Sequence, residues 1–288
     1  MTAMNSTSMA RTPAKTRIAR RFEELGRQGE MGLVAFITAG DPSLAATESF
    51  VLGLADAGAD VIELGVPFSD PVADGPAIQA SSERALRAGT TLEGVLNMVA
   101  SIRRKSDVPL VLFSYYNPVL QMGVESFAKR AADSGADGVL ITDLTPEEAG
   151  HYHAVVQAHG LDTIFLAAPT STDERMARIA GVTSGFLYVI SRTGVTGARE
   201  SLPEDLPGLV RRVRRVTRLP IAVGFGISLP GQVSILGGLA DAAVVGSALV
   251  QEIERAQSVE GAREALVSRV RQLKQAGKAG MSRREPSA

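Results

Sequence analysis

The chain has 288 residues, of which 45% are hydrophobic and 5% aromatic with no Trp, and its formal net charge is −1. Such a chain lacks the basic field and the stacking side chains that nucleic-acid-binding proteins use, so we expect no nucleic-acid partner. Cys is absent, which excludes disulfides, thiolate nucleophiles and Cys-ligated zinc.

Both ends of the sequence are polar. Residues 1–15 are rich in Ser, Thr and Ala and lack the apolar segment of a secretion signal. Residues 277–288 are similarly polar, so we predict disordered tails at 1–15 and 277–288 around a single domain at 16–276. Apolar runs are interrupted by Gly, Asp or Pro before they reach membrane-spanning length, which favours a cytoplasmic protein with no membrane partner.

Between these ends, short apolar runs alternate with longer amphipathic patterns, as expected for strands buried on both faces and the helices that cover them. We expect strands at Gly32–Thr38, Asp60–Val66, Leu110–Ser114, Gly138–Thr142, Thr163–Ala167, Gly185–Ile190, Ile221–Gly224 and Ala243–Val245. We expect helices at Ser43–Ala57, Leu92–Lys105, Glu125–Ser134, Pro146–Ala158, Thr172–Ala180, Leu206–Val216 and Ser247–Ala276.

Three similar motifs, here called the helix-to-strand motifs, connect a predicted helix to the following strand. They are DAGAD at Asp56–Asp60, DSGADG at Asp133–Gly138 and GGLADAA at Gly237–Ala243. Repeated right-handed βα units close into a barrel, whereas an open doubly wound sheet would carry its phosphate-binding glycines after the first strand. The Gly-rich segments of this chain come late, so we predict an α/β protein with a (β/α)8 TIM-barrel fold in one domain.

The second predicted strand carries a glutamate. Side chains alternate along a strand, so Glu63 points opposite to Ile62 and Leu64 and faces the barrel interior if those two pack against helices. A structural ion pair is the alternative, but the neighbouring strands offer no inward-facing basic residue. Burial should raise the pKa of Glu63, which suits a group that gives and takes a proton near neutral pH.

The loop after this strand, PFSDPVADGP, holds two more carboxylates. Asp70 and Asp74 lie among prolines that stiffen the loop, and either one is also suited to cap the helix that begins near Ala77. A second carboxylate above Glu63 fits a two-site proton-transfer mechanism. Spacing alone leaves Asp70 and Asp74 nearly equal as candidates.

Glycines follow the last three predicted strands. The sixth runs into SRTGVTGAR, a loop suited to fold over a ligand, the seventh into Gly224–Ser228, and the eighth into Gly246 and Ser247 at the start of a helix. Backbone N–H groups at such positions, with a helix N-terminus, favour a phosphate. We therefore predict a phosphorylated substrate.

Several residue types are missing from the strand ends. The three histidines, His151, His153 and His159, fall on or just after one predicted helix, and no predicted strand ends in Lys. This disfavours a metal site and a Schiff-base aldolase. The remaining chemistry is acid–base catalysis on a substrate that supplies its own electron sink. The basic cluster of Arg211, Arg212, Arg214 and Arg215 is expected to be a solvated helix face.

Four motifs, each after its expected strand, resemble one family. FITAGDP (Phe36–Pro42), ELGVPFSDPVADGP (Glu63–Pro76), SRTGVTG (Ser191–Gly197) and GFGIS (Gly224–Ser228) resemble the α subunit of tryptophan synthase, and the resemblance extends over about residues 18–275. It implies a retro-aldol cleavage of indole-3-glycerol phosphate to indole and D-glyceraldehyde 3-phosphate. Once protonated at C3, the indole ring is itself the electron sink, so neither Lys nor metal is required.

The resemblance also assigns roles to residues. It implies that Glu63 is the main acid–base residue and that Asp74, rather than Asp70, holds the indole N–H. It places Tyr188 and Phe36 in the substrate pocket, although simple core packing explains Phe36 and Phe225 equally well. It further implies that Thr196 meets Asp74 when the loop closes. The phosphate-binding residues that it implies are Gly197, Phe225, Gly226, Gly246 and Ser247.

The family implies a partner, the tryptophan synthase β subunit, in an α2β2 heterotetramer. Pyridoxal phosphate is expected in that partner and no cofactor in this chain. The segment Tyr115–Gly123, with Asn117 and Pro118, and the loop after the second strand are expected at the contact. Thr145 stands where the family usually has Pro; this departure touches the surroundings of the loop and is expected to tune activity without touching a catalytic position. Two other functions stay open, a stand-alone indole-3-glycerol phosphate lyase and a non-catalytic activator of a β subunit.

Overall fold

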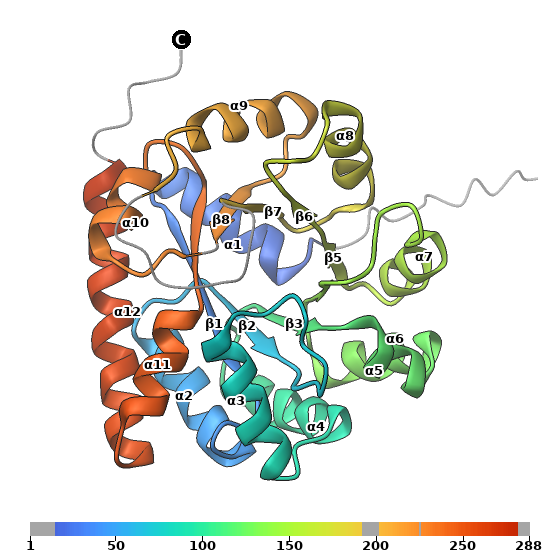
Figure 1. Cartoon of the computed structure of the whole chain (residues 1–288), viewed down its shortest axis with the longest axis vertical. Coiled ribbons are helices and arrows are strands. Elements are labelled where there is room, and N and C mark those ends of the chain that lie inside the picture. The colour runs from blue at the N-terminus through green and yellow to red at the C-terminus, as the bar shows by residue number, and fades with distance from the viewer. Residues whose placement is uncertain (1–14, 192–201, 225, 282–288) are drawn as a thin grey trace, which may run out of the picture.

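The computed structural model describes residues 15–191, 202–224 and 226–281 of the chain. Its strands form one parallel sheet in the order β5-β4-β3-β2-β1-β9-β8-β7-β6, and helices surround this sheet (Figure 1). The strands are β1 (Gly32–Thr38), β2 (Val61–Gly65), β3 (Leu110–Ser114), β4 (Gly138–Ile141), β5 (Asp162–Ile164), β6 (Leu166–Ala167), β7 (Leu187–Ile190), β8 (Ile221–Gly224) and β9 (Ala242–Val245). The helices are α1 (Arg17–Gln28), α2 (Leu44–Asp56), α3 (Pro76–Arg87), α4 (Leu92–Arg103), α5 (Tyr116–Met122), α6 (Val124–Ser134), α7 (Gly150–Ala158), α8 (Asp173–Val182), α9 (Leu206–Val216), α10 (Pro230–Leu236), α11 (Ser247–Arg255) and α12 (Val259–Met281).

The two ends of the sheet are consecutive in the chain. Among the described strands, β5 pairs only with β4 and β6 only with β7, and the single residue Phe165 joins β5 to β6. The fifth predicted strand is therefore two short strands, and the change of partner at Phe165 brings the sheet round to an almost closed barrel. The prediction of a TIM barrel is confirmed.

Buried apolar side chains form two layers. The outer layer lies between the strands and the surrounding helices and includes Ile62 and Leu64 of β2. The inner layer fills the barrel and includes Val61 of β2 together with Ile18 and Phe22 of α1. Successive residues of β2 thus alternate between the layers, as a strand with a side-chain period of two requires. The same alternation turns the residue after Ile62 toward the interior.

Helix α1, which the sequence analysis did not predict, is held against the amino-terminal ends of the strands. Ile18 packs beside Gly138 at the start of β4, and Leu25 packs beside Gly32 at the start of β1. The helix begins at Thr16, whose hydroxyl accepts from the Ala19 amide and donates to Asp162 Oδ2 at 2.6 Å. One end of the barrel is thereby covered, and a substrate must enter from the other.

The three helix-to-strand motifs have a common structural role. Each contains an Asp that directly precedes a strand and accepts a hydrogen bond from a backbone amide at or near the start of the neighbouring strand: Asp60 from Leu33, Asp137 from Leu110 and Asp241 from Ile221. Basic side chains form ion pairs with these carboxylates. Arg21 and Lys274 contact Asp60, and Arg17 and Arg103 contact Asp137. The repeats therefore stabilise the closed end of the barrel.

Asp137→Ala is expected to lower the free energy of unfolding by about 3 kcal/mol, because it leaves the Leu110 amide and two arginines without their buried carboxylate. Urea unfolding at neutral pH measures this change. Asp107→Ala is the matched control, since Asp107 also contacts Arg17 but its side chain is 94% exposed. Equal losses in the two variants would contradict the assigned role.

The C-terminal region differs from the prediction in two ways. The single helix expected at Ser247–Ala276 is two helices, α11 and α12, because Ala256 is extended and the Ser258 hydroxyl accepts from the Gly261 amide to start a new helix. Helix α12 continues to Met281, so residues 277–281 are helical and do not belong to a disordered tail. The remainder of the predicted tails, 1–14 and 282–288, lies outside the described residues.

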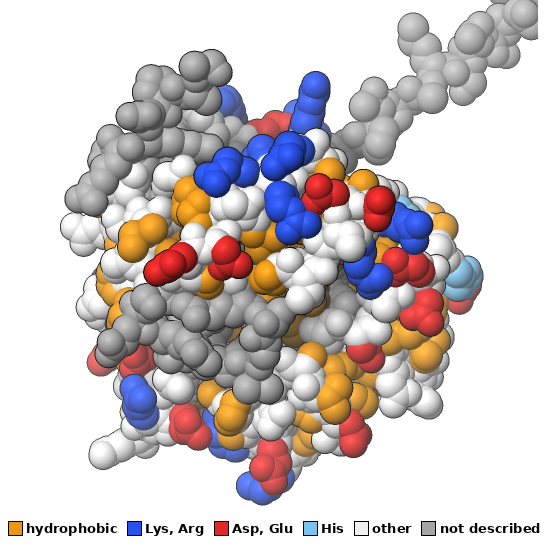
Figure 2. Space-filling view, turned by 45° about the horizontal axis from the view of Figure 1, so that its top comes forward, with side chains coloured by type: hydrophobic (Ala, Val, Ile, Leu, Met, Phe, Trp, Pro, Cys, Tyr) orange, Lys and Arg blue, Asp and Glu red, His pale blue; other side chains and the backbone are white. Residues whose placement is uncertain are grey.

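The arginine cluster of α9 faces solvent. Leu209, Val210 and Val213 of this helix are buried, whereas Arg211 and Arg215 are exposed. Figure 2 shows Lys and Arg side chains gathered near the top of that view, the side on which α9 lies in Figure 1. No helix in the described part of the chain is long and apolar enough to cross a membrane.

Candidate active site

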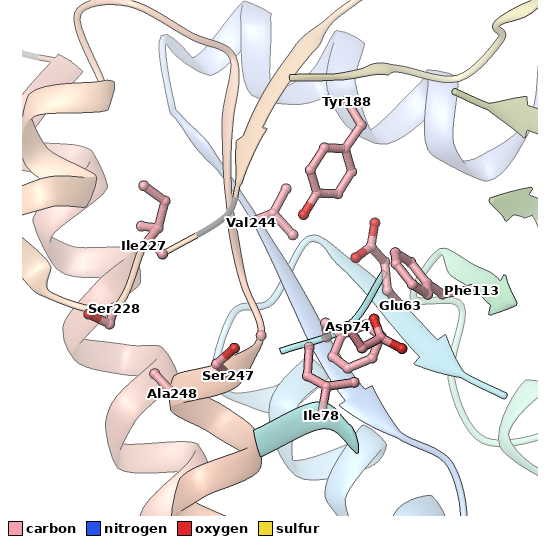
Figure 3. A pocket seen from close by; sticks show the side chains of 13 residues that line it. Glu63, Asp74, Ile78, Phe113, Tyr188, Ile227, Ser228, Val244, Ser247 and Ala248 are labelled. Atoms are coloured by element: carbon pink, nitrogen blue, oxygen red, sulfur yellow. The ribbon is translucent and has the colours of Figure 1, made fainter. Parts of the chain in front are cut away.

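A pocket opens at the carboxyl ends of the strands, where the active sites of TIM barrels lie. Side chains from β1, β2, β3, β7 and β9 and from the starts of α3 and α11 converge on it (Figure 3). Its lining residues are Phe36, Glu63, Asp74, Ile78, Phe113, Tyr188, Gly226, Ile227, Ser228, Val244, Gly246, Ser247 and Ala248.

Glu63 lies on β2 with its side chain in the pocket. Its backbone is in register with Phe36 of β1 and Val111 of β3, so it stands in the middle of the inner barrel layer. The side chain is fully buried, and neither carboxyl oxygen has a hydrogen-bond partner among the described residues. Burial alone raises the pKa of Glu63 to about 8. At neutral pH this carboxyl group is mostly protonated and able to donate a proton into the pocket.

Asp74 lies in the loop between β2 and α3 and is 7% exposed. The Tyr115 hydroxyl donates to Asp74 Oδ2 at 3.1 Å and accepts from the Ala73 amide at 2.9 Å, which fixes the loop beside the pocket. Burial raises the pKa of Asp74 to about 6, and the hydrogen bond from Tyr115 opposes this rise. Asp74 is therefore mostly ionised at neutral pH, which suits a group that accepts a hydrogen bond and faces positive charge.

Asp70, the other candidate of the same loop, is exposed and accepts from Ser69. Neither aspartate caps α3, because that helix begins after Gly75 with no side-chain capping bond. Among the described residues, the two carboxyl groups that line the pocket are thus Glu63 and Asp74, and their surroundings separate their pKa values. Two carboxyl groups with different protonation states at one pH are the arrangement that acid–base catalysis requires.

Tyr115→Phe is expected to reduce kcat/KM about tenfold and to move the acid limb of its pH dependence upward. The variant loses the hydrogen bond that lowers the pKa of Asp74 and also frees the Ala73 amide. Steady-state kinetics between pH 5 and pH 9 measure both effects. Tyr116→Phe is the control, because Tyr116 packs on Tyr152 away from the pocket. An unchanged acid limb in Tyr115→Phe would contradict this role.

Aromatic rings form one wall of the pocket. Phe36 and Phe113 meet edge to face with ring centroids 5.1 Å apart, and Gly65 leaves room for Phe36, since a Cβ there would lie 2.6 Å from the ring. Tyr188 points into the pocket toward Glu63 (Figure 3), and burial raises the pKa of its hydroxyl. A Cβ on Gly224 would lie 2.3 Å from that hydroxyl oxygen, so Gly224 makes the orientation of Tyr188 possible. A flat apolar ring fits this wall.

The opposite part of the pocket is lined by small and polar residues. Gly226 has φ +85°, a conformation that favours glycine, and Gly246 precedes Ser247, the first residue of α11. The amides at the start of a helix, with its dipole, favour an anion. Gly226, Gly246 and Ser247 thus lie together, as their sequence positions predicted. Thr196, Gly197 and Phe225 lie outside the described residues.

The structure adds pocket residues that the sequence analysis missed. Phe113 could have been found from strand alternation, since Leu110 and Leu112 of β3 pack in the outer layer. Tyr115 was assigned only to a partner contact, because its reach to the Asp74 loop is a contact between distant segments. Ile78, Ile227, Ser228, Val244 and Ala248 carried no signal beyond their nearness to predicted site residues.

The histidines lie away from the pocket. His153 of α7 contacts the Thr163 hydroxyl, and His159 contacts the Val155 carbonyl. Among the described residues, no group of three His, Cys, Asp or Glu side chains is arranged to hold a metal ion.

Known proteins with similar sequences share one description. A family model described as tryptophan synthase alpha chain matches residues 22–278. The chain is 53% identical over 239 residues to the tryptophan synthase alpha chain of Geotalea daltonii, covering 83% of this chain and 90% of that protein. It is 51% identical over 259 residues to the tryptophan synthase alpha chain of Solibacter usitatus, covering 90% and 97%.

Solved structures agree in fold. A structure of tryptophan synthase from Mycobacterium tuberculosis superposes with a TM-score of 0.85 at 34% identity, covering 92% of this chain and 99% of that one. Tryptophan synthase subunit alpha from Legionella pneumophila superposes with a TM-score of 0.84 at 38% identity, covering 91% and 98%. The matched region contains both the barrel and every described residue of the pocket.

Proposed function

The chain belongs to the tryptophan synthase alpha chain family, and from that premise we propose that Glu63 and Asp74 carry the family's reaction in this pocket. The protein is the lyase of tryptophan biosynthesis that cleaves indole-3-glycerol phosphate to indole and glyceraldehyde 3-phosphate. The observation that supports the assignment of roles is the buried Glu63 carboxyl group, which has no hydrogen-bond partner among the described residues and a pKa of about 8.

Glu63 moves the proton. In its protonated form it donates to indole C3, which gives an indoleninium ion that draws electrons from the bond between C3 and the side chain. The resulting carboxylate takes the proton of the side-chain hydroxyl as that bond breaks, which releases indole and the aldehyde. The net change is one proton moved from oxygen to carbon, and Glu63 regains its starting state. The raised pKa matches both halves of this cycle near neutral pH.

Asp74 stabilises the positive charge. As a carboxylate with a pKa of about 6, it accepts the indole N–H and opposes the charge that develops on the ring. Phe36 and Tyr188 hold the flat ring on the aromatic side of the pocket, and Gly226, Gly246 and Ser247 receive the phosphate on the other. For Thr196, Gly197 and Phe225 the resemblance to the family is the only support for a binding role.

The family implies a β-subunit partner. The finer picture, an α2β2 complex with pyridoxal phosphate in the β subunit and none in this chain, is our proposal. Two exposed apolar side chains support a contact near the pocket: Val72 in the Asp74 loop is 80% exposed, and Leu120 in the predicted contact segment Tyr115–Gly123 is 51% exposed. Asn117 and Pro118 lie in the same segment, on α5. A cytoplasmic location fits a biosynthetic enzyme and is likewise proposed.

Thr145, the departure from the family's usual Pro, donates through its hydroxyl to Glu148 at 3.0 Å and does not line the pocket. We therefore expect no direct part for Thr145 in cleavage.

Indole release from indole-3-glycerol phosphate, measured with and without a β subunit, tests the proposed function. We expect measurable cleavage by the chain alone and a marked increase when the β subunit is added. A high rate that the β subunit does not change would indicate a stand-alone lyase. Absence of cleavage under both conditions, with activation of the β subunit retained, would indicate a non-catalytic activator.

A further inference from the structure

The segment Gly226–Leu229, here called the phosphate loop, is held by hydrogen bonds to side chains that do not line the pocket. Gln232 of α10 is 3% exposed, and its Oε1 accepts from the amides of Ser228 at 2.8 Å and Leu229 at 2.9 Å. Arg269 of α12 donates through Nη2 to the Ser228 carbonyl at 3.0 Å. Ser228 lines the pocket, so Gln232 and Arg269 together hold the orientation of a peptide at its phosphate side.

Arg269 carries charge that no described residue neutralises. Its Nε is buried and has no hydrogen-bond partner among the described residues, and no carboxylate in this part of the chain forms an ion pair with it. Arg84 and Arg103, which also reach into the structure from helices, are by contrast paired with the buried Asp41 and Asp137. A partly buried guanidinium without a counter-ion costs free energy unless an anion comes near it.

The phosphate of the substrate is a suitable anion. It would bind in front of the phosphate loop, with Arg269 behind the same loop and the Ser228 peptide between them. We propose that Arg269, supported by Gln232, is a positioning residue of the phosphate site, which fixes the Ser228 peptide and supplies a positive charge that favours doubly charged phosphates over neutral ligands. This proposal rests on the proposed function, because it takes the Gly226–Ser247 side of the pocket to be the phosphate side.

Three variants separate charge from structure. Arg269→Met removes the charge at similar length, and Arg269→Lys keeps the charge. Gln232→Glu keeps an oxygen acceptor for both amides and adds a negative charge beside the loop. The matched control is Arg271→Met, which makes the same charge change at an exposed position of the same helix. Calorimetric titration of each variant with glycerol 3-phosphate, inorganic phosphate and indole gives the affinities.

We expect Arg269→Met to weaken the binding of glycerol 3-phosphate and of inorganic phosphate about tenfold, which corresponds to about 1.4 kcal/mol of binding free energy. The affinity for indole should stay within about twofold of the wild-type value. KM for indole-3-glycerol phosphate should rise by a similar factor while kcat stays near that of the wild type. Arg269→Lys should recover most of the phosphate affinity, Gln232→Glu should weaken it, and Arg271→Met should not change it. The differences should shrink at high salt.

Equal loss of phosphate and indole binding in Arg269→Met, or no recovery in Arg269→Lys, would mean that Arg269 is merely structural and would overturn the proposal. Unchanged phosphate affinity in Arg269→Met would overturn it as well. If Arg269→Met does not fold, Gln232→Glu decides, because unaltered phosphate affinity in that variant contradicts a role for local charge. Failure of the proposed function gives a different result, since the wild type would then bind neither glycerol 3-phosphate nor inorganic phosphate.

Discussion

Glu63→Gln should lower kcat/KM for cleavage of indole-3-glycerol phosphate by about 10³-fold or more, because the amide can neither donate a proton to indole C3 nor take one from the side-chain hydroxyl. The substitution keeps the shape of the side chain, so affinity for glycerol 3-phosphate should remain within about twofold. Indole release and calorimetric titration measure these two quantities. In the wild type, kcat/KM should fall with a basic limb near pH 8, because Glu63 loses its proton there.

Glu83→Gln is a suitable control for this variant, because Glu83 on α3 is exposed and contacts only Arg87 among the described residues. Its kinetics should equal those of the wild type. If Glu63→Gln lost affinity for glycerol 3-phosphate as well as activity, Glu63 would be a structural residue. Retention of most of the cleavage activity would refute its catalytic role directly.

Stability gives an independent check on Glu63. Its pKa is raised from 4.5 to about 8 in the folded chain, so the native state binds more protons than the unfolded state between these values. The contribution of Glu63 to the free energy of unfolding therefore falls as pH rises through this interval. Glu63→Gln has no such dependence. The free energy of unfolding of Glu63→Gln should therefore increase relative to that of the wild type by up to about 1.4 kcal/mol for each pH unit across the same interval.

Asp74→Asn should reduce kcat/KM by about 10²-fold to 10³-fold, because the amide retains the size of the side chain but removes the negative charge opposite the indoleninium ion. In the wild type, kcat/KM should rise with an acid limb near pH 6, where Asp74 ionises. This acid limb should be absent from the pH profile of Asp74→Asn. Measurement of kcat/KM from pH 5 to pH 9 reports these free-enzyme ionisations.

Asp70→Asn is the matched control for Asp74, since both residues belong to one loop but Asp70 is exposed. It should retain the activity and the acid limb of the wild type. Similar losses in Asp70→Asn and Asp74→Asn would mean that the loop as a whole, and not the buried carboxylate, is required.

Much of the fold was predictable because its signals are local. The apolar runs of β1, β3 and β8 gave strand boundaries that the structure reproduces, and alternation in β2 was enough to orient Glu63. The break between α11 and α12 was missed, although Ser258 is a good N-cap residue, because the apolar pattern continues across it. Helix α1 was missed because its charged residues hide the spacing of Ile18, Phe22 and Leu25.

The parts of the site that were not predictable depend on contacts between distant segments. Nothing in the local sequence says that Tyr115 reaches Asp74 across 41 positions of the chain, or that Arg269 reaches Ser228 from α12 across a similar separation. The role of the three helix-to-strand motifs also needed the structure. Their aspartates bind the amides of neighbouring strands at the closed end of the barrel, far from the catalytic end.

The central claim is that Glu63 is a proton donor at neutral pH. Infrared spectroscopy of the protonated carboxyl band tests it most directly, with the band of Glu63 identified as the one missing from Glu63→Gln. We predict that this band persists through neutral pH and is half lost at about pH 8. Loss of the band near pH 4.5, the ordinary pKa of Glu, would show an ionised Glu63 at neutral pH and would contradict the mechanism.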